Sequence, residues 1–209
     1  MIHRRDLLIG AAALAGAGLV RPPRAAAAPA TVGQPAPAFS LASSTGGPAV
    51  SLGDQRGKVV VLEWTNHDCP YVRKHYDTKN MQAIQKEAAG QGIVWLSVIS
   101  SAPGTQGHVS AGQANELTKT RGASPTAVLF DPTGVVGKAY GATTTPHMYV
   151  VTKDGTLVYA GAIDDKPTSR RNDVEGAQNY VRAALAAVAA GQPVKVPVTR
   201  AYGCSIKYA

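Results

Sequence analysis

Cys69 is the residue of this sequence best placed to do chemistry. It follows a run rich in β-branched and aromatic residues over 59–65, which predicts a strand buried on both faces. Pro70 is typical of the first position of a helix, so Cys69 is expected at the N-cap. There, free backbone N–H groups and the helix dipole favour a thiolate and would lower the thiol pKa below about 8.5. The alternative is a small buried cysteine that closes a strand.

The second cysteine of the chain, Cys204, follows a Pro-rich tail over 193–203 that is expected to be flexible. An even pair of cysteines in an oxidising compartment can form one disulfide. That bond could be made and broken in turnover, with Cys69 attacking a disulfide, or being oxidised by a hydroperoxide, before Cys204 displaces the product. Alternatively, it could be a permanent link that stabilises the fold by about 4–5 kcal/mol.

The N-terminal residues predict an export signal of the twin-arginine type over 1–30. Arg4 and Arg5 precede an apolar stretch over 7–20, and an Ala-rich segment over 25–30 offers cleavage after Ala27 or Ala30. The apolar stretch is shorter than the roughly 20 residues that span a membrane, although an uncleaved membrane anchor is the alternative. The mature protein is therefore expected in a bacterial periplasm, with no membrane association after cleavage.

Charge and length narrow the class of protein further. The formal net charge is +8, and it falls to +5 without residues 1–30, which hold four arginines and one aspartate. Basic residues are scattered and do not alternate with aromatic ones, so no nucleic-acid surface is predicted. The remaining length suits one domain over 31–192, followed by a tail over 193–209 that carries Cys204.

The pattern of apolar residues predicts an α/β three-layer sandwich with a central mixed β-sheet. An extended arm and hairpin over 32–52 leads to the first core strand, and Lys153-Asp154-Gly155 is a hairpin signal between the last two strands. The other expected strands cover 93–99, 127–130, 146–151 and 156–162, and the expected helices include Met81, Ile84 and Ala88, then 114–121, 135–140 and 174–188.

Five short motifs follow one another along the mature chain: Ala-Pro-Ala-Phe-Ser-Leu at 36–41, Gly57-Lys58, Cys69-Pro70-Tyr71-Val72, Thr145-Pro146, and Gly203-Cys204-Ser205-Ile206-Lys207. In their order and spacing the chain resembles the thioredoxin-like superfamily, specifically its exported peroxiredoxin-like branch (redoxin, AhpC/TSA type). This resemblance implies a thioredoxin-like fold and an antioxidant thiol–disulfide oxidoreductase that needs no cofactor and no metal. It also implies a protein disulfide or a hydroperoxide as substrate, and a thiol reductant as partner.

The resemblance assigns the two cysteines as catalytic, with two departures from its relatives. Cys69 matches the attacking cysteine of the thioredoxin Cys-x-x-Cys motif, but Val72 occupies the second position, so Cys204 is left as the resolving thiol. The Pro-x-x-x-Thr-x-x-Cys motif of peroxiredoxins is also missing before Cys69, which argues against peroxidase activity.

The resemblance also assigns residues around the cysteines. Glu63 matches the buried acid that exchanges a proton with the resolving thiol, unless it lies at a sheet edge with its head in solvent. Pro146 matches the cis-proline beside the active-site cysteine. Its neighbours Thr145 and His147, together with Pro70 and Tyr71, are the expected substrate-binding residues, although His147 could instead face solvent.

Three further possibilities remain open at this point. Arg73 and Lys74 could add positive potential near the sulfur or simply form a solvated helix face. A copper- or metal-handling protein of the same fold could use His67, Cys69 and His147, since imidazole and thiolate suit copper and zinc. A non-enzymatic redox sensor with a structural Cys69–Cys204 disulfide is the third.

Overall fold

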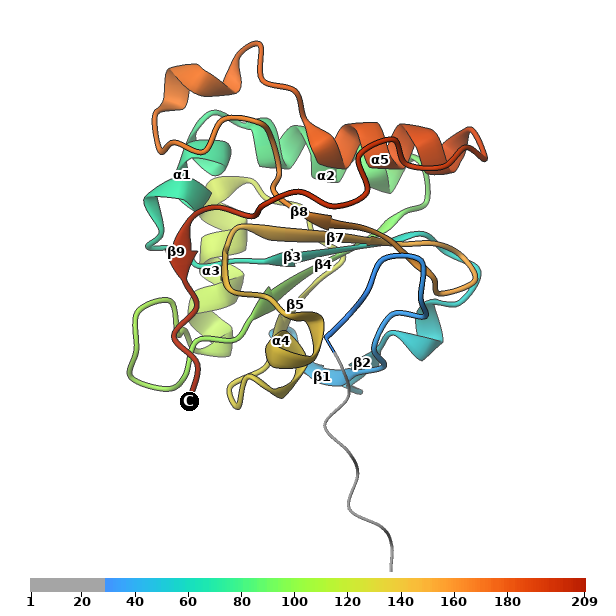
Figure 1. The fold of residues 1–209 in the computed structure, drawn as a ribbon. Helices are drawn as coiled ribbons and strands as arrows, with labels where there is room; N and C mark the ends of the chain where they lie inside the picture. The colour runs from blue at the N-terminus through green and yellow to red at the C-terminus, as the bar shows by residue number, and fades with distance from the viewer. Residues whose placement is uncertain (1–28) are drawn as a thin grey trace, which may run out of the picture.

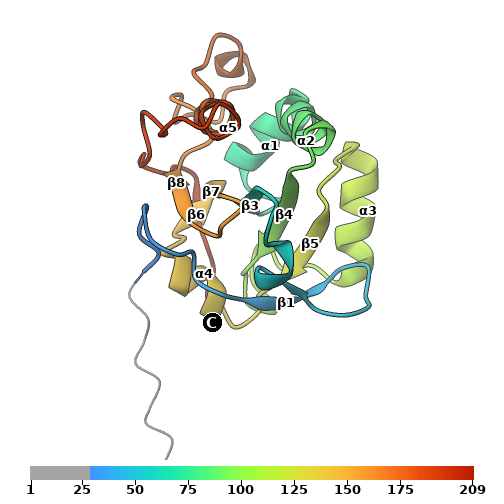
Figure 2. The same ribbon diagram turned by 90° about the vertical axis from the view of Figure 1, so that its right-hand side faces the viewer.

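The computed structural model describes residues 29–209, so the predicted export signal lies outside the described residues except for its last two positions. Within that range, a seven-stranded mixed sheet has the order β2-β1-β5-β4-β3-β7-β8 (Figures 1 and 2). Its strands are β1 (Ser40–Ser43), β2 (Val50–Ser51), β3 (Val60–Trp64), β4 (Val94–Ile99), β5 (Ala127–Phe130), β7 (His147–Val151) and β8 (Leu157–Gly161).

Helices cover both faces of the sheet, which makes the predicted three-layer sandwich. Buried side chains of α1 (Pro70–Asp77), α2 (Asn80–Gly90) and α5 (Tyr180–Ala189) share one core cluster with one face of β3 and β4. The cluster on the opposite face includes Tyr140 of α4 (Val135–Tyr140). Helix α3 (Ala111–Arg121) packs against Ile99 and Val128 in a third cluster.

The central position of β3 explains why its residues are apolar apart from Glu63. It pairs with β4 in parallel and with β7 antiparallel, and all five of its residues are buried. The predicted strands and the hairpin over 32–52 are confirmed as β1 to β5, β7 and β8 of this sheet. Gly155, at φ +84°, allows the predicted tight turn between β7 and β8.

Two expectations about the helices were wrong in detail. The segment after Cys69 forms two helices instead of one, because Lys79 adopts a left-handed conformation at φ 62° between α1 and α2. The last helix begins at Tyr180, not at 174, since Asn179 caps it by accepting a hydrogen bond from the Arg182 N–H. Residues 171–174 form a separate 3-10 turn, η2 (Arg171–Val174).

The expectation of a flexible tail was also wrong, because the tail is bound along its length (red in Figure 1). The Ala160 N–H donates to Pro197, and the Thr199 N–H returns a bond to Ala160, at 3.0 and 3.1 Å. Beyond this, β9 (Cys204–Ser205) pairs antiparallel with β6 (Thr144–Thr145). The tail thus runs beside β8 and then crosses the end of the sheet where α1 begins.

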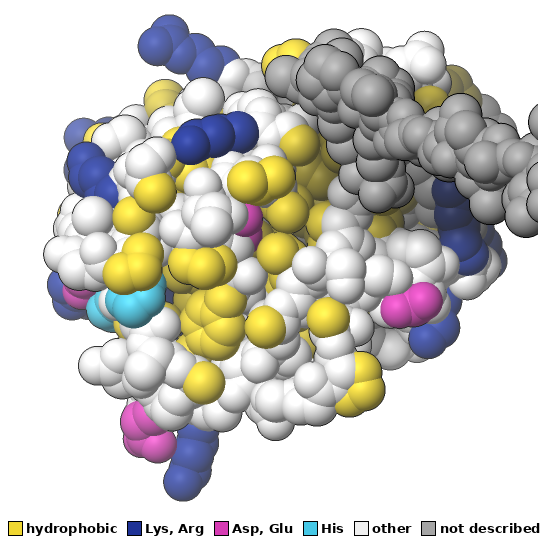
Figure 3. All heavy atoms as spheres, turned by 90° about the horizontal axis from the view of Figure 1, so that it is seen from below, with side chains coloured by type: hydrophobic (Ala, Val, Ile, Leu, Met, Phe, Trp, Pro, Cys, Tyr) yellow, Lys and Arg dark blue, Asp and Glu magenta, His cyan; other side chains and the backbone are white. Residues whose placement is uncertain are grey.

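The end of the tail lies against α4. The Tyr208 hydroxyl donates to the Ala142 carbonyl at 2.6 Å. Seen from below, on the side of α4, hydrophobic side chains gather over the middle of the described surface and most charged side chains lie toward its rim (Figure 3). Within residues 29–209, no helix combines the length and apolar character needed to cross a bilayer.

Candidate active site

Cys69 occupies the helix N-cap, as its sequence context predicts. Its backbone is extended, at φ −71° and ψ 121°, and Pro70 is the first residue of α1. The buried Asn66 stabilises the loop between β3 and α1, because its side-chain oxygen accepts a hydrogen bond from the Asp68 N–H at 2.9 Å. Strand β3 ends at Trp64, so Cys69 does not close the strand, but the cysteine is buried, as the alternative expects.

The Cys69 side chain is completely buried in this conformation. Its Sγ–H donates to the Thr145 carbonyl at 3.1 Å. Tyr202 and Cys204, both on the tail, and Tyr71 of α1 pack against the cluster that contains this sulfur. Two of these residues belong to the tail, and Cys204 lies close enough to Cys69 for their side chains to interact.

The Thr145 carbonyl is the point at which the two cysteines converge. The Thr145–Pro146 peptide bond is cis, as expected from the resemblance. Thr145 pairs with Cys204 in the β6–β9 ladder, while its carbonyl accepts from Cys69. Both cysteines are free thiols. The chain therefore brings its two thiols close together at Thr145, which sequence separation alone does not indicate.

Cys204 is a weak acid in this position. Burial of its thiol, followed by interaction with the Cys69 sulfur, raises the pKa of Cys204 to about 12. Its side chain therefore remains protonated at neutral pH. A protonated thiol beside Cys69 can donate a hydrogen bond to a thiolate formed there, and it must lose its proton before it can attack.

Glu63 is fully buried in the centre of the sheet, so the alternative of an edge position was wrong. Its carboxylate oxygens accept from Tyr76 and Trp95 at 2.8 Å, and from Ser97 and Gln85 at 3.0 and 3.4 Å. Burial raises its pKa above 4.5, although the hydrogen bonds from Trp95, Tyr76 and Ser97 oppose this shift. Neither cysteine is among these partners, so a role of Glu63 in proton transfer stays a prediction.

The raised pKa of Glu63 predicts a pH dependence of stability. The folded state holds the proton more tightly than the unfolded state, so the free energy of unfolding should fall as pH rises above about 4.5, until the folded carboxyl is ionised. Glu63→Gln removes this group. Urea unfolding of both proteins at pH 4.5 and 7.5 should show a larger loss in the native sequence, and equal losses would contradict the shift.

The expected substrate-binding residues lie at different depths. Pro70 is exposed, Tyr71 and His147 are partly buried, and Thr145 is buried. The His147 ring stacks on Tyr149, with centroids 4.6 Å apart, on the face of β7 opposite to Met148, which packs in the cluster of Cys69. Burial lowers the pKa of His147 to about 4, so it is neutral at pH 7. Substrate contacts by these residues stay predictions.

The arrangement does not favour the metal-handling alternative. Among residues 29–209, no group of three or more His, Cys, Asp or Glu side chains is placed to hold a metal ion. His67 pairs with Asp68 at 3.3 Å, and His147 stacks on Tyr149. The proposed set of His67, Cys69 and His147 therefore does not assemble in this conformation.

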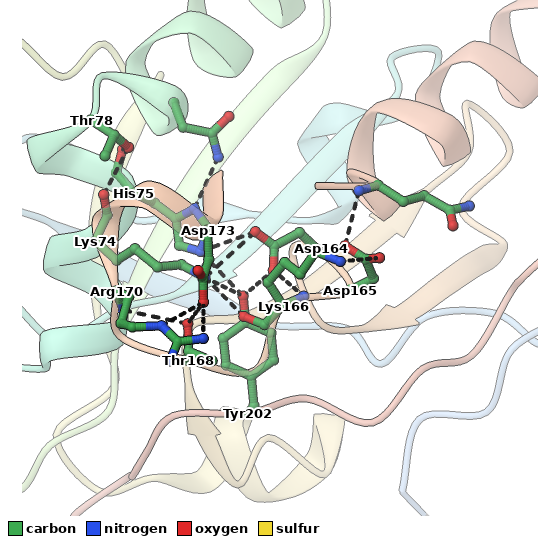
Figure 4. Close-up of polar contacts among 12 residues, drawn as sticks. Lys74, His75, Thr78, Asp164, Asp165, Lys166, Thr168, Arg170, Asp173 and Tyr202 are labelled. Atoms are coloured by element: carbon green, nitrogen blue, oxygen red, sulfur yellow. Dashed lines mark hydrogen bonds and ion pairs between the residues drawn. The ribbon is translucent and has the colours of Figure 1, made fainter. Parts of the chain in front are cut away.

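Sequence reasoning missed a polar cluster next to the cysteines. The expectation of a solvated face was wrong for Lys74, which is buried together with His75, while Arg73 is exposed. Lys74 lies 3.6 Å from the buried Asp164. Tyr202, two residues before Cys204, donates to the same carboxylate (Figure 4). The only signal in the sequence is the apolar run that precedes Asp164 at the end of a predicted strand.

Comparisons with known proteins agree with this fold. The Redoxin family model matches residues 31–180. Two similar crystal structures have a TM-score of 0.74: a hypothetical protein from Sinorhizobium meliloti 1021 and an uncharacterized conserved protein from Geobacillus kaustophilus. They are 25% and 28% identical, each aligned over 86% of this chain and over 95% and 93% of their own.

A less similar crystal structure belongs to a protein named for its activity. A proposed thiol:disulfide interchange protein DsbE from Chlorobium tepidum is 25% identical, with a TM-score of 0.51, over 63% of this chain and 84% of its own. No curated protein matches the sequence. The fold is thioredoxin-like, and because the family model covers well over half of the chain, the protein belongs to the Redoxin family.

Proposed function

We propose that the protein is a two-cysteine thiol–disulfide oxidoreductase in which Cys69 attacks the substrate and Cys204 resolves the product. The observation that carries the proposal is the convergence of both thiols on Thr145. Cys69 donates to the Thr145 carbonyl at 3.1 Å, and Cys204 is paired with Thr145 in the β6–β9 ladder. A resolving thiol held this close gives an intramolecular step with a large advantage over an outside thiol.

The cycle balances with a disulfide as oxidant. The Cys69 thiolate attacks one sulfur of the substrate disulfide, forms a mixed disulfide and releases the other half as a thiolate, which takes up a proton. Cys204 then loses its proton and attacks the Cys69 sulfur, which forms the Cys69–Cys204 bond and releases the second substrate thiol. An external dithiol reduces this bond and resets both cysteines. The substrate is reduced, and the dithiol is finally oxidised.

A disulfide is a better substrate for this site than a hydroperoxide. The Thr145 carbonyl beside the Cys69 sulfur accepts hydrogen bonds and cannot donate one to a departing peroxide oxygen, and the S–H of Cys204 is only a weak donor. The cationic group of Lys74 is engaged with Asp164 and with the Lys166 carbonyl. The predicted export signal over 1–30 supports a periplasmic site of action, where protein disulfides are abundant.

The test is a stopped-flow comparison of the reduced protein against oxidised glutathione and hydrogen peroxide. We expect faster loss of free thiols with glutathione disulfide, followed by a Cys69–Cys204 bond in the mass map that mild dithiol reopens. Cys69→Ser protein is the control and should not react. A bond that resists dithiol would indicate a permanent link, and reversible oxidation without reduction of any substrate would indicate a sensor.

A further inference from the structure

A cluster of buried polar side chains joins the tail to the helix that carries Cys69. Lys74 and His75 come from α1, Asp164 from the segment after β8, and Tyr202 from the tail (Figure 4). The side chains of Lys74 and His75 have no exposed surface, and that of Asp164 is 1% exposed. Because buried charges are costly unless they are paired, removing one member of the cluster would leave its partners unpaired in the interior.

The Tyr202 hydroxyl is at the centre of the cluster. It donates to Asp164 Oδ1, and it accepts from Lys74 Nζ at 3.2 Å. His75 Nε2 lies 3.3 Å from the same oxygen, and the Asn80 amide nitrogen lies 2.9 Å from the other ring nitrogen, Nδ1. Because that amide donates to Nδ1, the proton of the neutral ring lies on Nε2, which donates to Tyr202. One donated and two accepted bonds use the full capacity of a hydroxyl. Figure 4 shows the side chains of Lys74, Asp164 and Tyr202 pointing toward one another.

The protonation states of His75 and Tyr202 fit these hydrogen bonds. Burial lowers the pKa of Lys74, and the nearby Asp164 carboxylate opposes that shift. Burial lowers the pKa of His75 to about 3, so its imidazole is neutral at pH 7. Burial and the hydrogen bond to Asp164 raise the pKa of Tyr202, which therefore keeps its proton and remains a donor.

We propose that Lys74, Asp164 and Tyr202 form a latch that positions Cys204 beside Cys69 and controls access to the Cys69 sulfur. Only Gly203 separates Tyr202 from Cys204, so the position of the Tyr202 ring sets the position of the thiol. The ring also packs edge-on against Tyr71, with centroids 5.9 Å apart, on the first turn of α1. Tyr202 is thus a positioning residue. The inference rests on the proposed function for its role in turnover.

The latch can be tested by the accessibility of Cys69, without any turnover. In reduced Cys204→Ser protein, iodoacetamide reports only on Cys69. Adding Tyr202→Phe removes the hydroxyl, keeps the ring and should increase the alkylation rate about tenfold, as expected when a hydrogen bond to a charged group is lost. The matched control is Tyr208→Phe, which removes another tail hydroxyl, bonded to the Ala142 carbonyl. It should change the rate less than about twofold.

A second measurement follows closure of the disulfide in protein that retains both cysteines. Tyr202→Phe should slow formation of the Cys69–Cys204 bond after the first attack, and Tyr208→Phe should not. Asp164→Asn, measured in parallel, should act like Tyr202→Phe because it weakens the same bond. Thermal unfolding of all variants separates an open latch from general destabilisation. If Tyr208→Phe protein is no more stable than Tyr202→Phe protein and still closes its disulfide at the parent rate, lost stability does not explain the slower closure.

The outcomes separate the two proposals. Equal alkylation rates for Tyr202→Phe and Tyr208→Phe would overturn the latch, whatever the protein does with disulfides. Faster alkylation of Tyr202→Phe protein, with no Cys69–Cys204 bond formed in the parent protein, would support control of access by the latch and refute the two-cysteine function. Faster alkylation together with slower closure is the result we expect.

Discussion

Cys204→Ser protein is expected to react once with a small aromatic disulfide such as 5,5′-dithiobis(2-nitrobenzoate) and then stop. Without added reductant, the parent protein should release two equivalents of aromatic thiol, because Cys204 displaces the half that remains on Cys69. The variant should release one equivalent and retain the mixed disulfide. We expect the second release in the parent protein to be at least about a thousandfold faster than displacement of the same half from Cys204→Ser protein by an added monothiol at about 1 mM, since an intramolecular thiol acts at a very high effective concentration. Absorbance and intact mass measure both steps.

Cys69→Ser protein is the matched control for this experiment, because it retains Cys204 and removes only the attacking sulfur. It should release no aromatic thiol at neutral pH, since the pKa of Cys204 is raised to about 12 mainly by burial. Parent protein that carries two aromatic mixed disulfides, with no Cys69–Cys204 bond in the mass map, would show that Cys204 does not resolve. Rapid release of aromatic thiol by Cys69→Ser protein would show that Cys204 can make the first attack, contrary to the assigned roles.

The local part of this site follows from short stretches of sequence. A run rich in β-branched and aromatic residues is typical of a strand buried on both faces, which matches the central position of β3. Pro70 is the first residue of the next helix, which makes Cys69 its N-cap. The prediction of a cis bond before Pro146 depends on the family resemblance, because the residue types alone do not distinguish a cis from a trans proline. Each of these features depends on neighbours in the chain.

The non-local part could not be predicted in the same way. Lys74 is charged and follows the exposed Arg73, so its burial makes sense only when Asp164 and Tyr202 are known to meet it. A Pro-rich tail likewise suggests flexibility until its pairing with Ala160 and Thr145 is seen. Contacts between residues this far apart depend on the whole fold, and a single sequence carries little signal for them.

Gly203→Ala is expected to separate the two halves of the proposed cycle. Gly203 has φ +138°, a conformation that residues with a Cβ rarely adopt, and a Cβ built there would lie 1.9 Å from the Thr145 carbonyl oxygen. The substitution must therefore move the tail away from β6. We expect closure of the Cys69–Cys204 bond to slow about a hundredfold, the typical effect of misplacing a reacting group by about 1 Å. The first attack by Cys69 should be unimpaired or faster, because the tail that covers the sulfur is displaced.

Gly191→Ala is the matched control, since it makes the same change at another glycine of positive φ, +65°, where a new Cβ meets nothing within 4 Å. It carries the conformational penalty of alanine without the clash, so its closure rate should remain near that of the parent protein. The two rates come from one experiment, in which burst release and second release of aromatic thiol are followed by stopped flow. If Gly203→Ala slowed the burst as much as the second release, the substitution would have damaged the Cys69 site itself. If it slowed neither, the close approach of the tail to Thr145 would not govern disulfide closure, and the convergence of the two thiols would lose its proposed role.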